Sequence, residues 1–270
     1  MKVKQFNTEY EYDLLTRYGE DKPLYQPMVN AFLLNEDRLL SFAESIEKTV
    51  PLLAEVTDEY WGEDMLPYWK NSWFGPLDAY SLATAINLWK PKTFLEIGSG
   101  VSTRFARLTL KKGNIASRLI SIDPSPRMEV DALCDEVIRK PLEECDSHYF
   151  EQLEAGDILF YDGSHRCFQN SDVTVFFLEI LPLLKKGVHV HIHDIFWPED
   201  YPTHWVERYY NEQYLLALLF QHRTPEWAID YGCRYVPHNE KLMAKYNKLE
   251  KRVGHTGIYP AGGSFWMTKQ

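Results

Sequence analysis

The segment 93–112 combines a short apolar strand pattern, the turn Gly98-Ser99-Gly100 and a helix pattern, in that order. Glycines in such a turn have no Cβ, so a ligand can approach the backbone closely, and the start of the following helix presents free backbone N–H groups. The segment therefore predicts a fold in which a nucleotide-like ligand meets a helix N-terminus at the end of a strand. A dinucleotide-binding turn carries a third glycine where this chain has Thr103, which disfavours a nicotinamide cofactor.

Strand and helix patterns alternate after this turn. Strands are predicted at 93–97, 118–122, 136–139, 157–161 and 187–193, and helices at 78–90, 101–112, within 142–153 and at 168–184. Alternation at this spacing indicates parallel strands joined by right-handed crossovers. The predicted class is α/β, a doubly wound and mostly parallel sheet of seven strands, with its ligand site at the carboxyl ends of the strands.

The two ends of the chain are expected to add to this core. Helical spacing of apolar residues over 37–56 predicts a helical N-terminal extension. Beyond residue 200, we expect a long helix at 203–221, an apolar segment at 227–236, a helix at 239–251 and a last strand at 264–268. We therefore divide the chain into a helical and aromatic extension, 1–75, and a ligand-binding domain, 76–270.

The bulk composition argues against several classes of protein. With 270 residues, 45% of them hydrophobic, the chain can bury a full core. Its formal net charge of −10 argues against a nucleic-acid binder, because such proteins contact phosphates with clustered Lys and Arg. The four cysteines form no close pair, which indicates neither a zinc framework nor a disulfide scaffold. No stretch has the length of a membrane-spanning helix, so we expect a cytoplasmic protein with a small-molecule partner, and a homo-oligomer stays open.

Two acidic residues refine the prediction of the ligand. Glu96 lies just before the glycines, where its carboxylate could meet a cationic group, and Asp123 ends the second strand, where an acid would accept both hydroxyls of a ribose. Each also has a structural interpretation, because Glu96 could cap the neighbouring helix and Asp123 could start the turn at Pro124. The presence of both acids in register favours a ligand site.

Residues 94–103, Phe-Leu-Glu-Ile-Gly-Ser-Gly-Val-Ser-Thr, resemble the first motif of class I S-adenosylmethionine-dependent methyltransferases, and 121–123, Ser-Ile-Asp, resemble the second. The resemblance implies that Gly98, Ser99 and Gly100 approach the methionine part of S-adenosylmethionine. It also implies that Asp123 holds the ribose and that Glu96 faces the amino group of the cofactor.

A second resemblance covers the later strands. Asp162-Gly163-Ser164-His165 and His193-Asp194 are similar to two elements of a bacterial subgroup of these enzymes, the methyltransferase family 24-like type. The similarity extends over residues 74–200 and departs where Cys167 replaces an aromatic residue and Val188 replaces a glycine. It implies that the protein methylates a small hydroxylated metabolite, such as a sugar or a natural-product intermediate, and that Asp162 lies beside the cofactor.

The chemistry of methyl transfer suggests which residues act. The enzyme mainly aligns donor and acceptor and removes a proton from the acceptor, and a histidine with a pKa near neutrality suits that task. His165, in a turn at the carboxyl end of a strand, is the first candidate for the base. His193 is the second candidate, and Asp162 lies beside both in the predicted sheet.

The same strand ends are also a candidate metal site. Asp162 and Asp194 end neighbouring strands in the predicted sheet, so their carboxylates could converge with His165 on Mg²⁺ or Mn²⁺. Here the chain resembles metal-dependent sugar and catechol O-methyltransferases, which hold magnesium with acids at these strand ends. In the other interpretation, Asp162 only orients His165 and Asp194 caps the following turn, and the sequence leaves both open.

Three histidines alternate along the fifth strand, and the pleat places His189, His191 and His193 on one face. A central parallel strand is covered on both faces by helices. We therefore expect His189 and His191 to be core residues with satisfied hydrogen bonds rather than metal ligands.

Aromatic residues flank the predicted sheet in the sequence. They are Trp61, Tyr68, Trp69, Trp73 and Phe74 before it, and Phe196, Trp197, Tyr201, His204, Trp205, Tyr209 and Tyr210 after the fifth strand. Two interpretations stay open: these side chains enclose an acceptor at the carboxyl edge of the sheet, or they pack the extension and the last helices onto it.

The resemblances together imply an enzyme that transfers a methyl group from S-adenosylmethionine to an oxygen, or in a less favoured alternative a nitrogen, of a small metabolite, with assistance from a metal left open. Two other functions stay open. One is an NAD(P)-dependent oxidoreductase on a Rossmann-like fold, which the missing third glycine disfavours. The other is a non-catalytic metabolite-binding or metal-binding protein.

Overall fold

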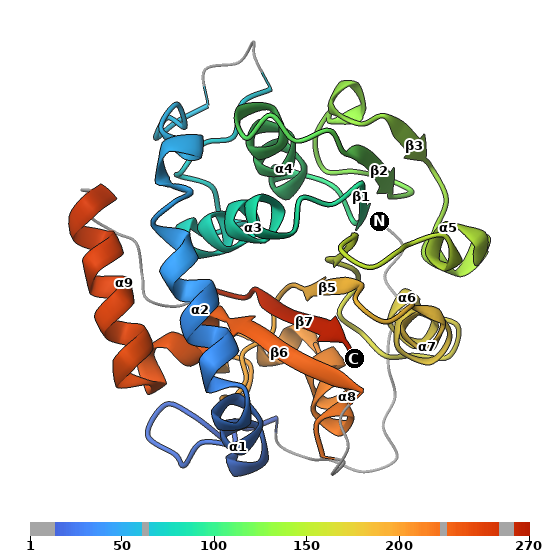
Figure 1. The fold of residues 1–270 in the computed structure, drawn as a ribbon. Coiled ribbons are helices and arrows are strands. Elements are labelled where there is room, and N and C mark those ends of the chain that lie inside the picture. The colour runs from blue at the N-terminus through green and yellow to red at the C-terminus, as the bar shows by residue number, and fades with distance from the viewer. Residues whose placement is uncertain (1–13, 61–64, 222–225, 254–261) are drawn as a thin grey trace.

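A computed structural model describes residues 14–60, 65–221, 226–253 and 262–270. Its centre is a seven-stranded sheet in the order β3-β2-β1-β4-β5-β7-β6, in which β7 runs antiparallel to both of its neighbours (Figure 1). The strands are β1 (Thr93–Ile97), β2 (Arg118–Ile122), β3 (Glu136–Ile138), β4 (Ile158–Tyr161), β5 (His189–Ile192), β6 (Trp227–Gly232) and β7 (Phe265–Lys269). The predicted α/β, doubly wound and mostly parallel sheet is confirmed.

Helices cover both faces of this sheet. Helices α2, α3 and α4 lie on one face, and α6, α7 and α8 lie on the other (Figure 1). The α-helices are α1 (Gln26–Leu34), α2 (Glu36–Ile46), α3 (Pro76–Trp89), α4 (Val101–Lys112), α5 (His148–Glu151), α6 (Asp172–Val175), α7 (Leu181–Leu183), α8 (Glu212–Leu219) and α9 (Glu240–Val253). A π-helical segment, η4 (Phe176–Ile180), joins α6 to α7, and the 3-10 helices are η1 (Val50–Leu53), η2 (Asp131–Leu133), η3 (Leu142–Glu144), η5 (Thr203–Arg208) and η6 (Cys233–His238).

The boundaries around the glycine turn agree with the sequence prediction, because β1, α4 and β2 begin and end at the predicted residues. The long helix expected at 203–221 is wrong. The chain instead forms η5, turns at Tyr209 with a left-handed backbone (φ 56°), and begins α8 at Glu212. This break matters for function, because it places Glu212 in the first turn of a helix that points at the carboxyl edge of the sheet.

The helical extension packs on the far end of the sheet. Phe42 of α2 stacks on Tyr231 of β6, with ring centroids 4.9 Å apart, and Arg38 forms an ion pair with Asp230. Two lysine–glutamate pairs, Lys241 with Glu36 and Lys245 with Glu44, join α9 to α2. The extension therefore covers β6 and leaves the carboxyl ends of β1, β2, β4 and β5 to the ligand site.

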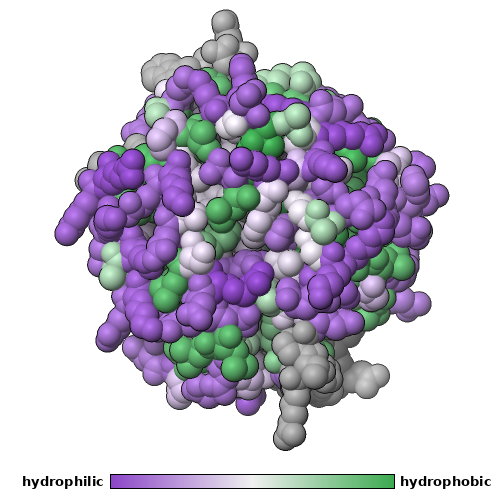
Figure 2. All heavy atoms as spheres, in the orientation of Figure 1, coloured by the Kyte–Doolittle hydropathy of each residue, from purple (hydrophilic) through white to green (hydrophobic). Residues whose placement is uncertain are grey.

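The surface and the helices give no sign of a membrane span. Among the described residues, no helix combines the length and the apolar character needed to cross a bilayer. Figure 2 shows a face on which hydrophilic residues predominate and apolar side chains lie scattered.

The end of α3 offers a test of local stability. Lys90 follows the helix in the left-handed conformation (φ 47°, ψ 57°), and its N–H donates to the carbonyl of Ile86. Glycine adopts this conformation without strain, so Lys90→Gly is expected to raise the free energy of unfolding by about 0.5–1 kcal/mol in urea denaturation. Lys111→Gly, within the right-handed backbone of α4, is the control and should lower it by up to about 1 kcal/mol. Equal effects of the two variants would contradict this explanation.

Candidate active site

The glycine turn lies between the ends of β2 and β4. The N–H of Gly98 donates to the carbonyl of Ile122 (3.0 Å), and the N–H of Asp162 donates to the carbonyl of Ile97 (2.9 Å). Gly98 has a φ of +79°, and a Cβ there would stand 1.9 Å from the carbonyl oxygen of Asp162. Gly100 differs, because nothing lies within 4 Å of its Cβ position. The first glycine is thus required by the fold, and the second leaves open space at the start of α4.

The side chain of Glu96 forms hydrogen bonds with the first turn of α4. Its carboxylate is fully buried and accepts hydrogen bonds from the hydroxyls of Ser102 and Thr103. Burial raises the pKa of Glu96 to about 8, against the opposing effect of these two hydrogen bonds. These contacts fit the structural interpretation of Glu96, and its proposed role toward the amino group of a cofactor stays a prediction.

Asp123 lies at the mouth of a cavity of about 350 Å³. One carboxylate oxygen accepts from the N–H of Ser99 (2.8 Å) and the other from the N–H of Ser125 (2.8 Å). Both predicted roles of Asp123 are thus compatible with its position, because it starts the turn after β2 and also faces the cavity. The lining includes Gly98, Ser99, Asp162, Pro141, Leu142, Glu143 and Ser164. The wall at 141–143 was not anticipated, because no motif marks it in the sequence.

The predicted cluster at the ends of β4 and β5 comes together. These strands are parallel neighbours, with Tyr161 opposite Ile192, so the residues that follow them meet at one edge. The Nε2 atom of His165 lies 3.3 Å from Asp162 Oδ1 and 3.5 Å from Asp194 Oδ2. One ligand atom from each of these three residues lies within 4.8 Å of the other two.

Two residues of this cluster have unusual backbones. His165 (φ 63°) and Asp194 (φ 56°) both adopt the left-handed conformation that glycine favours. Their backbones are held by neighbours: the N–H of Asn211 donates to the carbonyl of His165 (2.9 Å), and Gly263 packs directly against Asp194. Strained residues that cluster in this way are typical of functional sites.

Glu212 is a site residue that the sequence analysis missed. Its Oε1 atom lies 2.6 Å from Nδ1 of His165, its side chain is fully buried, and its Oε2 has no hydrogen-bond partner among the described residues. This contact turns Nε2 of His165 toward Asp162 and Asp194. The signal that could have revealed it is Asn211, a residue type that favours the N-cap, directly before Glu212 in a segment whose apolar pattern predicts one continuous helix.

His193 stands beside the cluster, between it and α3. Its Nδ1 lies 3.5 Å from Asp194 Oδ1 and 3.8 Å from Asp162 Oδ1, and its Nε2 lies 3.9 Å from Asp78 Oδ2. Asp78 is the third residue of α3, and its carboxylate accepts from the N–H of Gly75, the N-cap residue, and from the N–H of Ser264. Its position next to His193 was not anticipated.

Four carboxylates thus surround two histidines. Burial lowers the pKa of His165, but Glu212 and Asp162 outweigh this effect and raise the pKa well above 6.5. Burial likewise opposes the protonation of His193, and the neighbouring Asp194 and Asp162 raise its pKa to about 9. The surrounding carboxylates therefore favour a proton on each ring when no other cation is near, and their negative charge attracts cations to the centre.

The other histidines of β5 are core residues, as predicted. His189 stacks on Trp89 (ring centroids 3.6 Å) and contacts the Thr268 hydroxyl. His191 stacks on Phe160 (3.8 Å), but neither of its ring nitrogens has a hydrogen-bond partner within the described part of the chain. The expectation of satisfied hydrogen bonds is therefore wrong for His191, whose pKa is lowered well below 6.5 by burial.

Some of the flanking aromatic residues pack in the core of the protein, and others line a cavity. Trp69 packs on Tyr80 in the core, and the indole N–H of Trp197 donates to the backbone of Gln213. The side chains of Tyr201, Trp205, Tyr209 and Tyr210 line a cavity beside His165. Trp73 is half exposed beneath the guanidinium of Arg127. Trp61 lies outside the described residues.

Part of the chain matches a known protein family. Residues 95–195 match a family model described as a methyltransferase domain. This segment contains the glycine turn, Asp123, Asp162, His165 and Asp194. No curated protein matches the chain significantly.

Solved structures with a similar fold bind S-adenosylhomocysteine (SAH). They include an O-methyltransferase from Bacillus cereus in complex with SAH (14% identity, 85% of this chain and 91% of that chain covered, TM-score 0.39) and the plantazolicin methyltransferase BpumL in complex with SAH (14%, 91% and 99%, 0.43). The SAH-bound methyltransferase PaMTH1 from Podospora anserina is a third (12%, 93% and 99%, 0.41).

The sheet and the matched segment support the class that the sequence motifs predicted, an S-adenosylmethionine-dependent methyltransferase. The oxidoreductase and the non-catalytic binding protein are thereby set aside. Within this class, residues 95–195 are similar to a methyltransferase domain of the family 24 type.

Proposed function

We propose that the enzyme transfers the methyl group of S-adenosylmethionine to a hydroxyl oxygen of a small acceptor at the carboxyl ends of β4 and β5. The observation that carries this proposal is the position of Asp162. Its side chain lines the cavity at the glycine turn and also lies 3.3 Å from Nε2 of His165. One residue therefore connects the cavity for the methyl donor with a cluster suited to an acceptor hydroxyl.

In this proposal the 350 Å³ cavity takes the nucleoside part of the cofactor. Asp123 receives the ribose hydroxyls, chiefly at Oδ1, which accepts from the N–H of Ser125 and keeps a further lone pair for a ligand, whereas Oδ2 accepts from both the N–H and the hydroxyl of Ser99. The open space at Gly100 takes the methionine part at the N-terminus of α4. The negative net charge of the chain favours a small acceptor over a nucleic acid.

A divalent cation fits the donor set of the cluster. Asp162, His165 and Asp194 offer two carboxylates and one imidazole, which suit Mg²⁺ or Mn²⁺, and each ligand atom is within 4.8 Å of the others. His165 Nδ1 forms a hydrogen bond with the buried carboxylate of Glu212, and metal-binding histidines are commonly oriented by such a bond at the ring nitrogen that does not bind the metal. When bound, such a cation would lower the pKa of an acceptor hydroxyl.

The acceptor proton then passes to His193 in this proposal, because a cation held by Asp162 and Asp194 would neutralise the carboxylates that otherwise keep a proton on this ring. Its Nδ1 faces Asp162 and Asp194, where the acceptor would lie, and its Nε2 faces the buried Asp78, which can stabilise a proton on that side. His165 keeps its place as a ligand, fixed by Glu212. The roles of the two histidines thus follow from which nitrogen of each ring faces the centre.

Calorimetric titration with SAH tests the proposed function. We expect SAH to bind, and we expect Asp123→Asn to weaken it about tenfold, because an amide oxygen is a weaker acceptor for the ribose hydroxyls than a carboxylate. Calorimetry on both proteins at equal concentration measures the difference. Failure of the wild-type protein to bind SAH would overturn the proposal.

Titration with Mn²⁺ tests the proposed cation site. Wild-type protein is expected to bind one Mn²⁺, and Asp194→Asn to weaken binding at least tenfold, because it removes a charged ligand. Asp135→Asn, which removes an acid paired with Arg107 away from the cluster, should leave the affinity unchanged. Electron paramagnetic resonance of free Mn²⁺ gives both values. Equal affinities in Asp194→Asn and the wild type would show that the cluster is not the site.

A further inference from the structure

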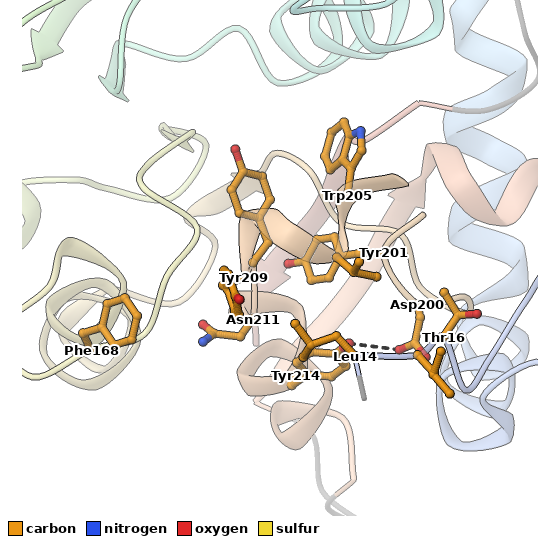
Figure 3. A pocket seen from close by; sticks show the side chains of 12 residues that line it. Leu14, Thr16, Phe168, Asp200, Tyr201, Trp205, Tyr209, Asn211 and Tyr214 are labelled. Carbon is orange, nitrogen blue, oxygen red and sulfur yellow. Dashed lines mark hydrogen bonds between the residues drawn. The ribbon is translucent and has the colours of Figure 1, made fainter. Parts of the chain in front are cut away.

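A cavity of about 430 Å³ lies beside the reacting centre, on the side away from the glycine turn. Its walls come from three segments: residues 14–16, Phe168, and the chain from 200 to 214. Figure 3 shows Trp205, Tyr209 and Tyr201 grouped on one side, with Phe168 and Asp200 at opposite ends. The size is within the usual range for small-molecule pockets.

Two residues of the lining, Tyr210 and Asn211, connect this cavity to His165. The ring of Tyr210, which lines it, lies 4.4 Å from the ring of His165. The next residue, Asn211, donates its N–H to the carbonyl of His165 and accepts from the N–H of Cys167. The ring of Tyr210 therefore separates a molecule in the cavity from His165 by the thickness of one side chain.

The polar groups of the lining are largely engaged with the protein. One carboxylate oxygen of Asp200 accepts from the N–H groups of Arg17 and Tyr18, and the other accepts from the hydroxyl of Tyr214 (Figure 3). The hydroxyl of Tyr201 accepts from the N–H of Gln213. A sugar, which needs many hydrogen bonds, finds few partners here.

The faces of aromatic rings are what remain for a ligand. The rings of Trp205 and Tyr210 lie 5.7 Å apart at nearly right angles, and Tyr201 lies 5.8 Å from Tyr210 in the same arrangement. The guanidinium of Arg208 stacks 3.8 Å over the ring of Trp205 and holds it in place. Such walls favour a flat ring that can stack against one face and meet another edge-on.

We infer that this cavity binds a flat aromatic acceptor, with a phenolic hydroxyl directed past Tyr210 toward the cluster beside His165. The inference rests on the proposed function and narrows its acceptor from small hydroxylated metabolites to phenols. In the reaction, the new O–CH₃ bond forms as the S–CH₃ bond of the sulfonium breaks, and the bonding electron pair returns to sulfur. The phenolic proton passes to His193, so SAH and an aryl methyl ether are the products.

Two probes with the same carbon skeleton test whether the cavity prefers a flat aromatic ring. In calorimetry with SAH-loaded protein, 2-naphthol is expected to bind at least about tenfold more tightly than its saturated counterpart decahydro-2-naphthol, which is puckered and cannot stack. Methyl glucoside should bind more weakly than both. Equal affinity for the two naphthalene-derived probes, stronger binding of the glucoside, or no binding of 2-naphthol would each overturn the inference.

Variants of Trp205 test whether the preference for 2-naphthol arises in this cavity. Trp205→Leu is expected to reduce the preference for 2-naphthol to less than threefold, and Trp205→Phe should keep most of it. Tyr60→Leu is the matched control, because Tyr60 also lies under an arginine, Arg104, but away from this cavity, and it should keep the full preference. A full preference in Trp205→Leu would overturn the assignment of this cavity.

The same titrations separate this inference from the proposed function. SAH affinity is measured first in every variant, and an unchanged value shows that the protein is folded. If SAH binds and 2-naphthol does not, the aromatic acceptor is wrong and the methyltransferase site stands. If SAH itself does not bind, the proposed function fails.

Discussion

Gly98→Ala is expected to lower the free energy of unfolding by about 3–5 kcal/mol and to abolish measurable SAH binding. The new Cβ would stand 1.9 Å from the carbonyl oxygen of Asp162, and the φ of +79° is unfavourable for alanine. The contact is with backbone, so no side-chain rotation can relieve it. Relief requires the ends of β1 and β4 to separate, which moves Asp162 out of the site. Urea denaturation and SAH calorimetry measure the two effects.

Gly100→Ala is the matched control, because it adds the same methyl group two residues later. Its backbone is extended (φ 174°) and its Cβ position is open, so stability should change by no more than about 0.5 kcal/mol. If the methionine part of the cofactor occupies that space, SAH affinity should still fall at least tenfold. A stable Gly98→Ala protein with normal SAH affinity would contradict the role given to the turn.

The sequence predicted the centre of the fold well, for a physical reason. In β1, α4 and β2 the hydrophobic pattern, the turn residues and the start of the helix all indicate the same local structure. Tertiary contacts therefore agree with the local preference of the sequence in this segment. The same local agreement placed Asp162 and Asp194 at adjacent strand ends, since a parallel sheet leaves few ways to arrange neighbouring strands.

The sequence predicted the region after β5 poorly. Apolar and aromatic residues over 203–221 fit a helix, but the left-handed turn at Tyr209 divides it, and no glycine or proline marks that break. Contacts with distant residues maintain it, such as the hydrogen bond from Asn211 to the carbonyl of His165. Because these contacts join residues far apart in sequence, Glu212 and the aromatic cavity could be found only in three dimensions.

The second large effect is expected at Glu212. Glu212→Gln should lower Mn²⁺ affinity and the kcat of methyl transfer to 2-naphthol by about 10–100-fold, since outer carboxylates of this kind contribute that much to metal sites. The amide keeps the shape of the side chain but loses the charge that faces Nδ1 of His165 at 2.6 Å. The imidazole then has a weaker partner, and its Nε2 is a poorer ligand. Because Glu212 does not line the cofactor cavity, SAH affinity should not change.

A second buried carboxylate distinguishes this positioning role from a general effect of removing buried charge. Asp230 is 5% exposed and is paired with Arg38 and Thr268 on β6, away from the cluster. Asp230→Asn should lower stability, because Arg38 loses its partner, yet leave Mn²⁺ affinity and kcat intact. Glu212→Asp, which keeps the charge but shortens the reach, should fall between the wild type and Glu212→Gln. If Glu212→Gln lost stability alone, with Mn²⁺ affinity and kcat at wild-type values, Glu212 would be a packing residue and His165 would need another explanation for its orientation.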